Sequence, residues 1–198
     1  MSRARFALYL AVAAIAGGAI TLELCASGQH LPPPDSNVAF PENHAQGIMY
    51  MTVNRAVNPM SAAGLENIAR VDDFYITPAA VHALRRGELV PSGTVITRVQ
   101  HRAQLDAQGN PLKDANGRFI KGALFGFGVM EKRTGWGDDS PPESRTGEWR
   151  FQAFTPDKNP NRNVNLDSCV RCHKPLASKD YLFSFDRIKA MAAKKVVD

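Results

Sequence analysis

Short, mainly apolar runs recur through the middle of the chain and predict β-strands, and in the last run, at 148–154, polar and aromatic residues alternate as expected for a half-buried strand. The runs are rich in β-branched and aromatic residues and lie at 48–53, 74–76, 93–100, 123–130 and 148–154. Turn-forming residues separate them, as expected for strands that run antiparallel to their neighbours. The pattern predicts a mainly β (α+β) fold, an antiparallel sheet with a few short helices.

Two segments carry helical signals instead. Thr77 is expected to cap a helix that has Pro78 at its first position and ends at Gly87. His82 lies within this helix, at a position typical of an ordinary surface histidine. A second helix, with a basic outer face, is expected at residues 186–197.

Turns and glycines shape the region between the third and fourth predicted strands. Two similar Asp/Asn/Gly turns, at 106–110 and 114–118, predict a hairpin arm that projects from the sheet. Gly126 and Gly128 interrupt the fourth strand. Either a β-bulge or a flat macrocycle packed against the backbone accounts for glycines at such positions.

The N-terminus has the composition of an export signal. Arg3 and Arg5 precede an apolar run from Phe6 to Leu22, and small residues within it offer cleavage sites. An uncleaved membrane anchor is the alternative, because the run is nearly long enough to span a bilayer. The expected organisation is a signal or anchor at 1–26, a Pro-rich linker at 27–39, a globular domain at 40–187 and a basic helix end at 188–198.

The overall charge is mildly basic, with a formal net charge of +5 and a pI of about 9.3. The positive residues are spread evenly along the chain, so nucleic acid is not expected as a partner. A small anion or an acidic protein fits this charge better.

The most informative chemistry lies near the C-terminus, where Cys169 and Cys172 are three positions apart and His173 follows directly. This order is the attachment pattern of a c-type haem. The two thiols would add to the porphyrin vinyl groups, and the adjacent imidazole would become the axial ligand of the iron. The sequence therefore predicts one covalent haem c, with Cys169, Cys172 and His173 as cofactor-binding residues and His173 as the metal ligand.

Two other interpretations of the motif are a redox-active dithiol and half of a zinc site. A structural zinc needs four ligands, and the chain has only 3 Cys and 5 His without a second Cys-x-x-Cys pair. Export also favours haem, because c-type cytochromes are assembled on the outer side of the bacterial inner membrane. The haem domain is accordingly expected in the periplasm.

The order of these features resembles the cytochrome P-460 family, which also contains the β-sheet cytochromes c-prime. The resemblance covers 40–187. The segments that carry it are Phe40-Pro41-Glu42-Asn43, Phe74-Tyr75-Ile76-Thr77-Pro78, Gly87-Glu88-Leu89, Gly93-Thr94-Val95, Val129-Met130-Glu131-Lys132, Trp149-Arg150-Phe151, the motif from Cys169 to His173, and Asp180-Tyr181-Leu182-Phe183. Their common order along the chain supports the assignment.

The resemblance implies a homodimeric β fold with one c-type haem, bound by histidine on one side and open on the other. Members named P-460 oxidise hydroxylamine and carry a lysine bonded to the porphyrin edge. Their c-prime relatives lack this bond and bind nitric oxide or a similar small ligand behind an apolar cap.

Arg98 occupies the position that the resemblance assigns to the cross-linking lysine. A guanidinium stays protonated and is a poor nucleophile, so a haem without the cross-link is expected. Arg98 would instead pair with a haem propionate or donate a hydrogen bond to a bound ligand, unless it is an ordinary surface residue. Lys121 and Lys132 are the alternatives if the register is shifted.

Three functions fit these features: binding of a small nitrogen compound such as nitric oxide, oxidation of hydroxylamine, and electron transfer by a six-coordinate haem. Phe125 and Phe127 are candidates for an apolar distal cap, and Glu131 is the candidate base, although it should point away from Met130. An electron-transfer protein is an expected partner in each case. Candidate sixth ligands for a carrier are Met49, Met51, Met60, Met130 and His101.

Overall fold

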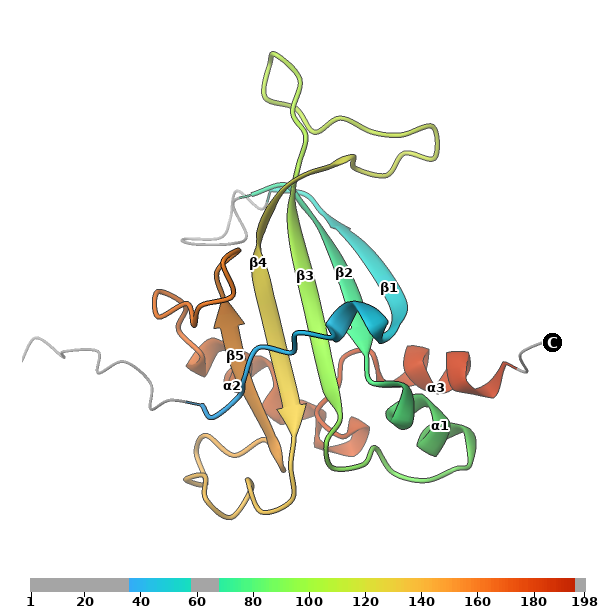
Figure 1. Ribbon diagram of the computed structural model, residues 1–198, viewed down its shortest axis with the longest axis vertical. Helices are drawn as coiled ribbons and strands as arrows, with labels where there is room; N and C mark the ends of the chain where they lie inside the picture. Colours follow the sequence, from blue (N-terminus) through green and yellow to red (C-terminus); the bar gives the residue numbers. More distant parts are fainter. Residues whose placement is uncertain (1–35, 58–67, 195–198) are drawn as a thin grey trace, which may run out of the picture. The chain divides into compact units, whose positions relative to one another are not determined.

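A computed structural model of the protein describes residues 36–57 and 68–194 (Figure 1). These residues belong to one compact unit that runs from Pro32 to Asp198. The export signal or anchor, most of the Pro-rich linker and Met60 lie outside the described residues. Within the part that is described, no helix has the length and apolar character needed to cross a membrane.

The core of the fold is a five-stranded sheet in which every neighbouring pair of strands is antiparallel and the spatial order follows the sequence. The strands are β1 (Ile48–Arg55), β2 (Arg70–Ile76), β3 (Val95–Ala103), β4 (Lys121–Lys132) and β5 (Trp149–Phe154). The helical elements are η1 (His44–Gln46), α1 (Pro78–Arg85), α2 (Asp167–His173), η3 (Lys174–Lys179) and α3 (Phe185–Ala193). The predicted mainly β fold with an antiparallel sheet and short helices is confirmed.

The two faces of the sheet are covered by different parts of the chain. One face, called the helix face below, packs against α1, α2 and α3. Its buried side chains include Ile76, Ile96 and Met130. Segment 36–47 crosses the opposite face, where Val38 and Phe40 pack on the sheet, as seen in front of the strands in Figure 1.

Coverage on both sides corrects one expectation from the sequence. The alternation in β5 suggested a strand with one buried and one exposed face. In the structure Phe151 faces the helices, while Gln152 and Phe154 are buried on the other side. Ser36 donates a hydrogen bond of 2.7 Å to the Gln152 carboxamide oxygen, so the N-terminal segment satisfies a polar group that alternation alone assigned to solvent.

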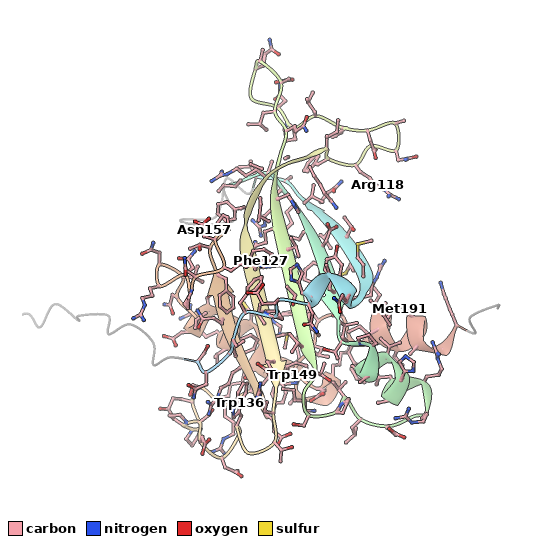
Figure 2. All side chains as sticks on the ribbon, viewed as in Figure 1. Arg118, Phe127, Trp136, Trp149, Asp157 and Met191 are labelled. Carbon is pink, nitrogen blue, oxygen red and sulfur yellow. The ribbon has the colours of Figure 1, made fainter. Side chains whose placement is uncertain are left out.

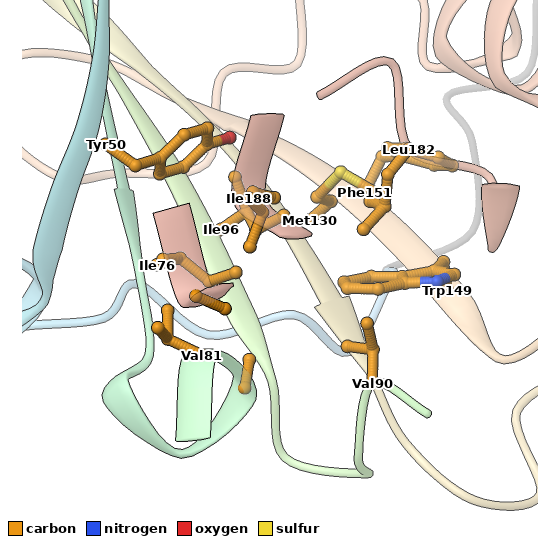
Figure 3. Close-up of a cluster of buried hydrophobic side chains, with 12 residues drawn as sticks. Tyr50, Ile76, Val81, Val90, Ile96, Met130, Trp149, Phe151, Leu182 and Ile188 are labelled. Carbon is orange, nitrogen blue, oxygen red and sulfur yellow. The ribbon is translucent and has the colours of Figure 1, made fainter. Parts of the chain in front are cut away.

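The largest apolar cluster lies between the helix face and the helices that cover it (Figure 3). Ile188 of α3 is fully buried in it, together with Leu182 and Trp149. Tyr50 of β1 places its hydroxyl 3.0 Å from the hydroxyl of Ser184, at the start of α3. Burial raises the pKa of Tyr50 to about 12. These contacts fix the C-terminal segment on the sheet.

The helix predicted after Thr77 is present as α1, but the role of Thr77 differs. Its hydroxyl makes no capping bond to α1. Instead it donates to the Val95 carbonyl at 3.2 Å and accepts from the Val95 N–H at 2.9 Å, which ties the start of α1 to β3. Gly87 follows the helix with a φ of +79°, a conformation that favours glycine, as expected for a helix end.

The hairpin arm is present and extends beyond the ends of the strands, where Arg118 is labelled in Figure 2. In the first turn the Asp106 carboxylate accepts backbone N–H bonds from Gln108 and Asn110 at 2.9 and 2.8 Å. Asp114 makes the same pair of bonds in the second turn. These Asx turns explain why the two Asp/Asn/Gly sequences predicted the arm.

Glycine occupies two positions in β4 for different structural reasons. Gly126 lies at a bulge, where the register between β3 and β4 shifts. Its φ is +152°, and a Cβ there would lie only 2.6 Å from the Phe154 carbonyl oxygen. Gly128 instead leaves room on the helix face for the Arg98 side chain, whose Nε would lie 3.2 Å from a Cβ at Gly128. A bulge accounts for the first position and a side-chain contact for the second.

Replacement of Ile188 by alanine should lower the free energy of unfolding by about 2–5 kcal/mol, because it opens a cavity in a fully buried part of the core. Urea unfolding of the purified protein measures the change. Leu89→Ala is the matched control, since Leu89 is 85% exposed and its loss should change the stability by less than about 0.5 kcal/mol. Equal effects of the two substitutions would contradict the packing of α3 on the sheet.

Candidate functional site

The Cys-x-x-Cys-His motif forms the helix α2 on the helix face of the sheet. Asn165 stabilises the turn that leads into this helix, because its side-chain oxygen accepts a hydrogen bond of 2.9 Å from the Asp167 N–H. Residues three apart on a helix lie on the same side, so both thiols face one direction. Cys169 is half-buried and Cys172 is exposed, and the two do not form a disulfide. Burial raises the pKa of the Cys169 thiol.

His173 ends α2 with its ring held in a defined orientation. The Nδ1 atom lies 2.6 Å from the Tyr181 carbonyl oxygen, and a carbonyl can only accept, so Nδ1 carries the proton. The rings of Phe151 and Phe183 pack against the His173 ring, each with a centroid 4.9 Å away. Burial lowers the pKa of His173, which favours the neutral imidazole. In this tautomer Nε2 has a free lone pair, as an axial metal ligand requires.

Arg98 lies on the same face of the sheet, half-buried beside the motif. Burial is the main cause that lowers its pKa, and electrostatic interactions with Asp72 and Cys169 raise it. The guanidinium is near enough to α2 for its charge to favour the thiolate form of Cys169 and to disfavour the protonated form of His173. Among the described residues, no hydrogen bond or ion pair is made by the side chain of Arg98, although its backbone belongs to the β-sheet.

Polar residues around Arg98 form a part of the site that the sequence did not indicate. Asp72 is fully buried and accepts hydrogen bonds from Arg55 Nε at 2.7 Å and Arg70 Nε at 3.2 Å. Gln100 is 3% exposed, and its Nε2 has no hydrogen-bond partner among the described residues. The sequence did not indicate Asp72 because β2 begins at Arg70, four residues before the strand predicted at 74–76.

The other distal candidates are separated from the motif. Phe127 packs in the apolar cluster on the opposite face of the sheet. Glu131 also points there, away from Met130 as expected, and accepts a hydrogen bond from Arg133 Nε at 2.6 Å. Phe125 lies at the bulge, under the Arg102 guanidinium at 4.7 Å. Of the four candidates, only Arg98 lies beside His173.

The two lysines that were alternatives to Arg98 have partners of their own. Lys121 pairs with Asp73. Lys132 Nζ donates hydrogen bonds of 2.8 and 3.1 Å to the Asp180 carboxylate. Both amines are therefore held by carboxylates.

The candidate sixth ligands that the structure describes lie in the core or at its margin, on the edge strand, or on the face of the sheet opposite α2. Met130 is buried in the core of the helix face, and Met51 is partly buried at its margin. Met49 is 53% exposed at the edge strand. His101 belongs to β3 on the face opposite α2, where burial lowers its pKa.

The residues present fit a haem better than a zinc ion. In the described part of the chain, no group of three or more His, Cys, Asp or Glu side chains could hold a metal. A c-type haem requires one imidazole nitrogen and two thiols on one side of a helix, and α2 supplies these. Its propionates ask for cationic or amide donors, and the guanidinium of Arg98 and the orphaned Gln100 Nε2 are such donors.

Comparison with known proteins agrees with this chemistry. No curated protein sequence matches the chain. The family model described as cytochrome P460 matches residues 47–184, which span all five strands and the Cys-x-x-Cys-His motif. The chain therefore belongs to the cytochrome P460 family, whose members are haem-binding cytochromes.

Proposed function

We propose that the protein is an exported, periplasmic mono-haem c-type cytochrome that binds a small nitrogen compound such as nitric oxide or hydroxylamine. Cys169 and Cys172 would hold the haem through thioethers, and His173 would supply the imidazole nitrogen that binds its iron. The observation that carries the proposal is the 2.6 Å contact between His173 Nδ1 and the Tyr181 carbonyl oxygen, because it orients a neutral imidazole and leaves Nε2 for a metal.

A bound haem would supply the iron that takes up the ligand and exchanges electrons with it. The chain supplies the surroundings. Phe151 and Phe183 restrict the orientation of the His173 ring. Arg98 and Gln100 offer hydrogen-bond donors to a carboxylate of the haem or to the small ligand.

Binding is favoured over oxidation of hydroxylamine, because oxidation needs a group that accepts protons. On the described strands, Asp72 is the only carboxylate that faces the helices, and Arg55 and Arg70 already occupy it. Glu131 lies on the opposite face. The site therefore offers donors for a ligand but no free strand carboxylate as a base.

We also propose that no lysine is bonded to the edge of the porphyrin. Arg98 is a poor nucleophile, and Lys121 and Lys132 are both paired with carboxylates. We also propose that the protein forms a homodimer, as the family resemblance implies. Its electron-transfer partner would be a protein whose acidic surface fits the mildly basic charge of this chain.

The decisive test is absorption spectroscopy of the full chain, produced in a bacterium with a working cytochrome-maturation system. The reduced protein should have an ordinary c-type spectrum that changes when carbon monoxide or nitric oxide is added. No change would indicate a sixth protein ligand and favour the electron carrier. A red-shifted spectrum of the P-460 type would show a lysine cross-link, and steady turnover of hydroxylamine would contradict a binding role.

Cys169→Ser and Cys172→Ser should each leave the haem attached through one thioether, and the double variant should release it to acidic organic solvent. The pyridine haemochrome spectrum, which responds to the number of unreacted vinyl groups, measures this. A double variant that keeps its haem under these conditions would refute attachment through α2.

Replacement of Arg98 by glutamine should lower the reduction potential of the haem, because a nearby cation stabilises the reduced iron. Spectroelectrochemical titration measures the change. Arg102→Gln is the matched control: it removes the same charge from the same strand, but Arg102 is exposed and stacks on Phe125. Equal shifts in the two variants would place Arg98 away from the haem.

A further inference from the structure

The loop that follows the haem motif contains two consecutive residues in an unfavourable conformation. Asp180 has φ and ψ of 49° and 39°, and Tyr181 has a φ of 61°. Left-handed conformations are costly for residues other than glycine and persist only where the surrounding structure holds them. The contacts that hold these two residues are therefore informative.

The first contact fixes the Asp180 side chain to the sheet. Lys132, at the end of β4, donates hydrogen bonds of 2.8 and 3.1 Å to its carboxylate. Trp149, at the start of β5, places its indole nitrogen 3.4 Å from Oδ1. The side chains of Lys132 and Asp180 are only 12% and 23% exposed, so water screens this pair weakly.

The second contact fixes the Tyr181 ring. The ring lies on Gly147, where a Cβ would be 2.6 Å from the ring atom Cε2. No side chain larger than glycine fits there without moving the ring. Backbone bonds complete the turn: the Tyr181 N–H donates to the Leu176 carbonyl at 2.8 Å, and the Leu182 N–H donates to that of Lys179 at 3.0 Å.

The result of this arrangement is the position of one carbonyl group. Between two clamped side chains, the Tyr181 carbonyl oxygen is brought to 2.6 Å from His173 Nδ1, eight residues earlier in the chain. Second-shell hydrogen bonds of this kind orient a ligating histidine and raise its basicity. The sheet thus affects the orientation of His173 indirectly, through its contacts with Asp180 and the hydrogen bond from His173 to the Tyr181 carbonyl.

We propose that Asp180, Lys132 and Gly147 are positioning residues that set the strength of the His173–Tyr181 hydrogen bond and thereby tune the axial ligand of the haem. This inference rests on the proposed function, because it requires that His173 binds the haem iron. A strong bond gives the imidazole more anionic character, which favours oxidised iron. A weaker bond raises the reduction potential and lowers the frequency of the iron–histidine stretching vibration.

The test is Gly147→Ala, which changes no charge and pushes the Tyr181 ring away. Gly135→Ala is the matched control: Gly135 lies in the same loop and has a φ of +90°, but a Cβ there meets nothing within 4 Å. In the holoprotein, Gly147→Ala should raise the reduction potential and lower the iron–histidine frequency seen by resonance Raman spectroscopy. Gly135→Ala should keep both values of the unmodified protein.

A second pair of variants covers the case in which Gly147→Ala does not fold. Asp180→Asn weakens the clamp and should also lower the iron–histidine frequency. Asp186→Asn, which removes a carboxylate that is 72% exposed and paired with Lys179, should not. An iron–histidine frequency that matches the unmodified protein in every one of these two variants that folds, Gly147→Ala and Asp180→Asn, or in Asp180→Asn alone, would overturn the inference. A chain without covalent haem would instead overturn the proposed function.

Discussion

The hydrogen bond between the ring of His173 and the carbonyl of Tyr181 is the contact around which the site is arranged. It joins the end of α2 to the turn that contains Asp180 and Tyr181. Both residues are in left-handed conformations, so α2 and η3 alone would not stabilise this turn. The sheet supplies what the turn lacks, through Lys132 and Trp149 at the adjoining ends of β4 and β5. A backbone interaction near the C-terminus therefore depends on strands formed much earlier in the chain.

The helix face of the sheet is divided along the strands. One end is apolar and is covered by α1 and α3, with Ile96 and Met130 in the core. Toward the arm, the same strands carry Asp72, Arg98 and Gln100. Burial of polar groups is costly unless they are paired. Asp72 is paired with two arginines, whereas Gln100 Nε2 has no hydrogen-bond partner in the part of the chain that the structure describes. This end of the face is therefore suited to a group that brings its own hydrogen-bond acceptors.

Arg98 connects the two halves of this face. It passes over Gly128, where the missing side chain leaves the room, and its charge acts on Cys169 and His173. An ammonium at this position would be a potential nucleophile, while a guanidinium is a permanent cation and a fork of donors. Under the proposed function, the arginine at this position would stabilise the haem electrostatically and would not form a covalent bond to the porphyrin.

The sequence by itself determined the sheet, the arm and the family. Alternation and turn residues are local properties, and Asp106 and Asp114 form their turns with backbone groups only a few residues away. The Cys-x-x-Cys-His motif is equally local. Only the tertiary structure decided which face each strand presents to α2, and so separated Arg98 from Phe127 and Glu131. It also decided that β5 is covered on both sides and that Asp180 anchors the turn behind His173, because these depend on contacts between residues distant in the sequence.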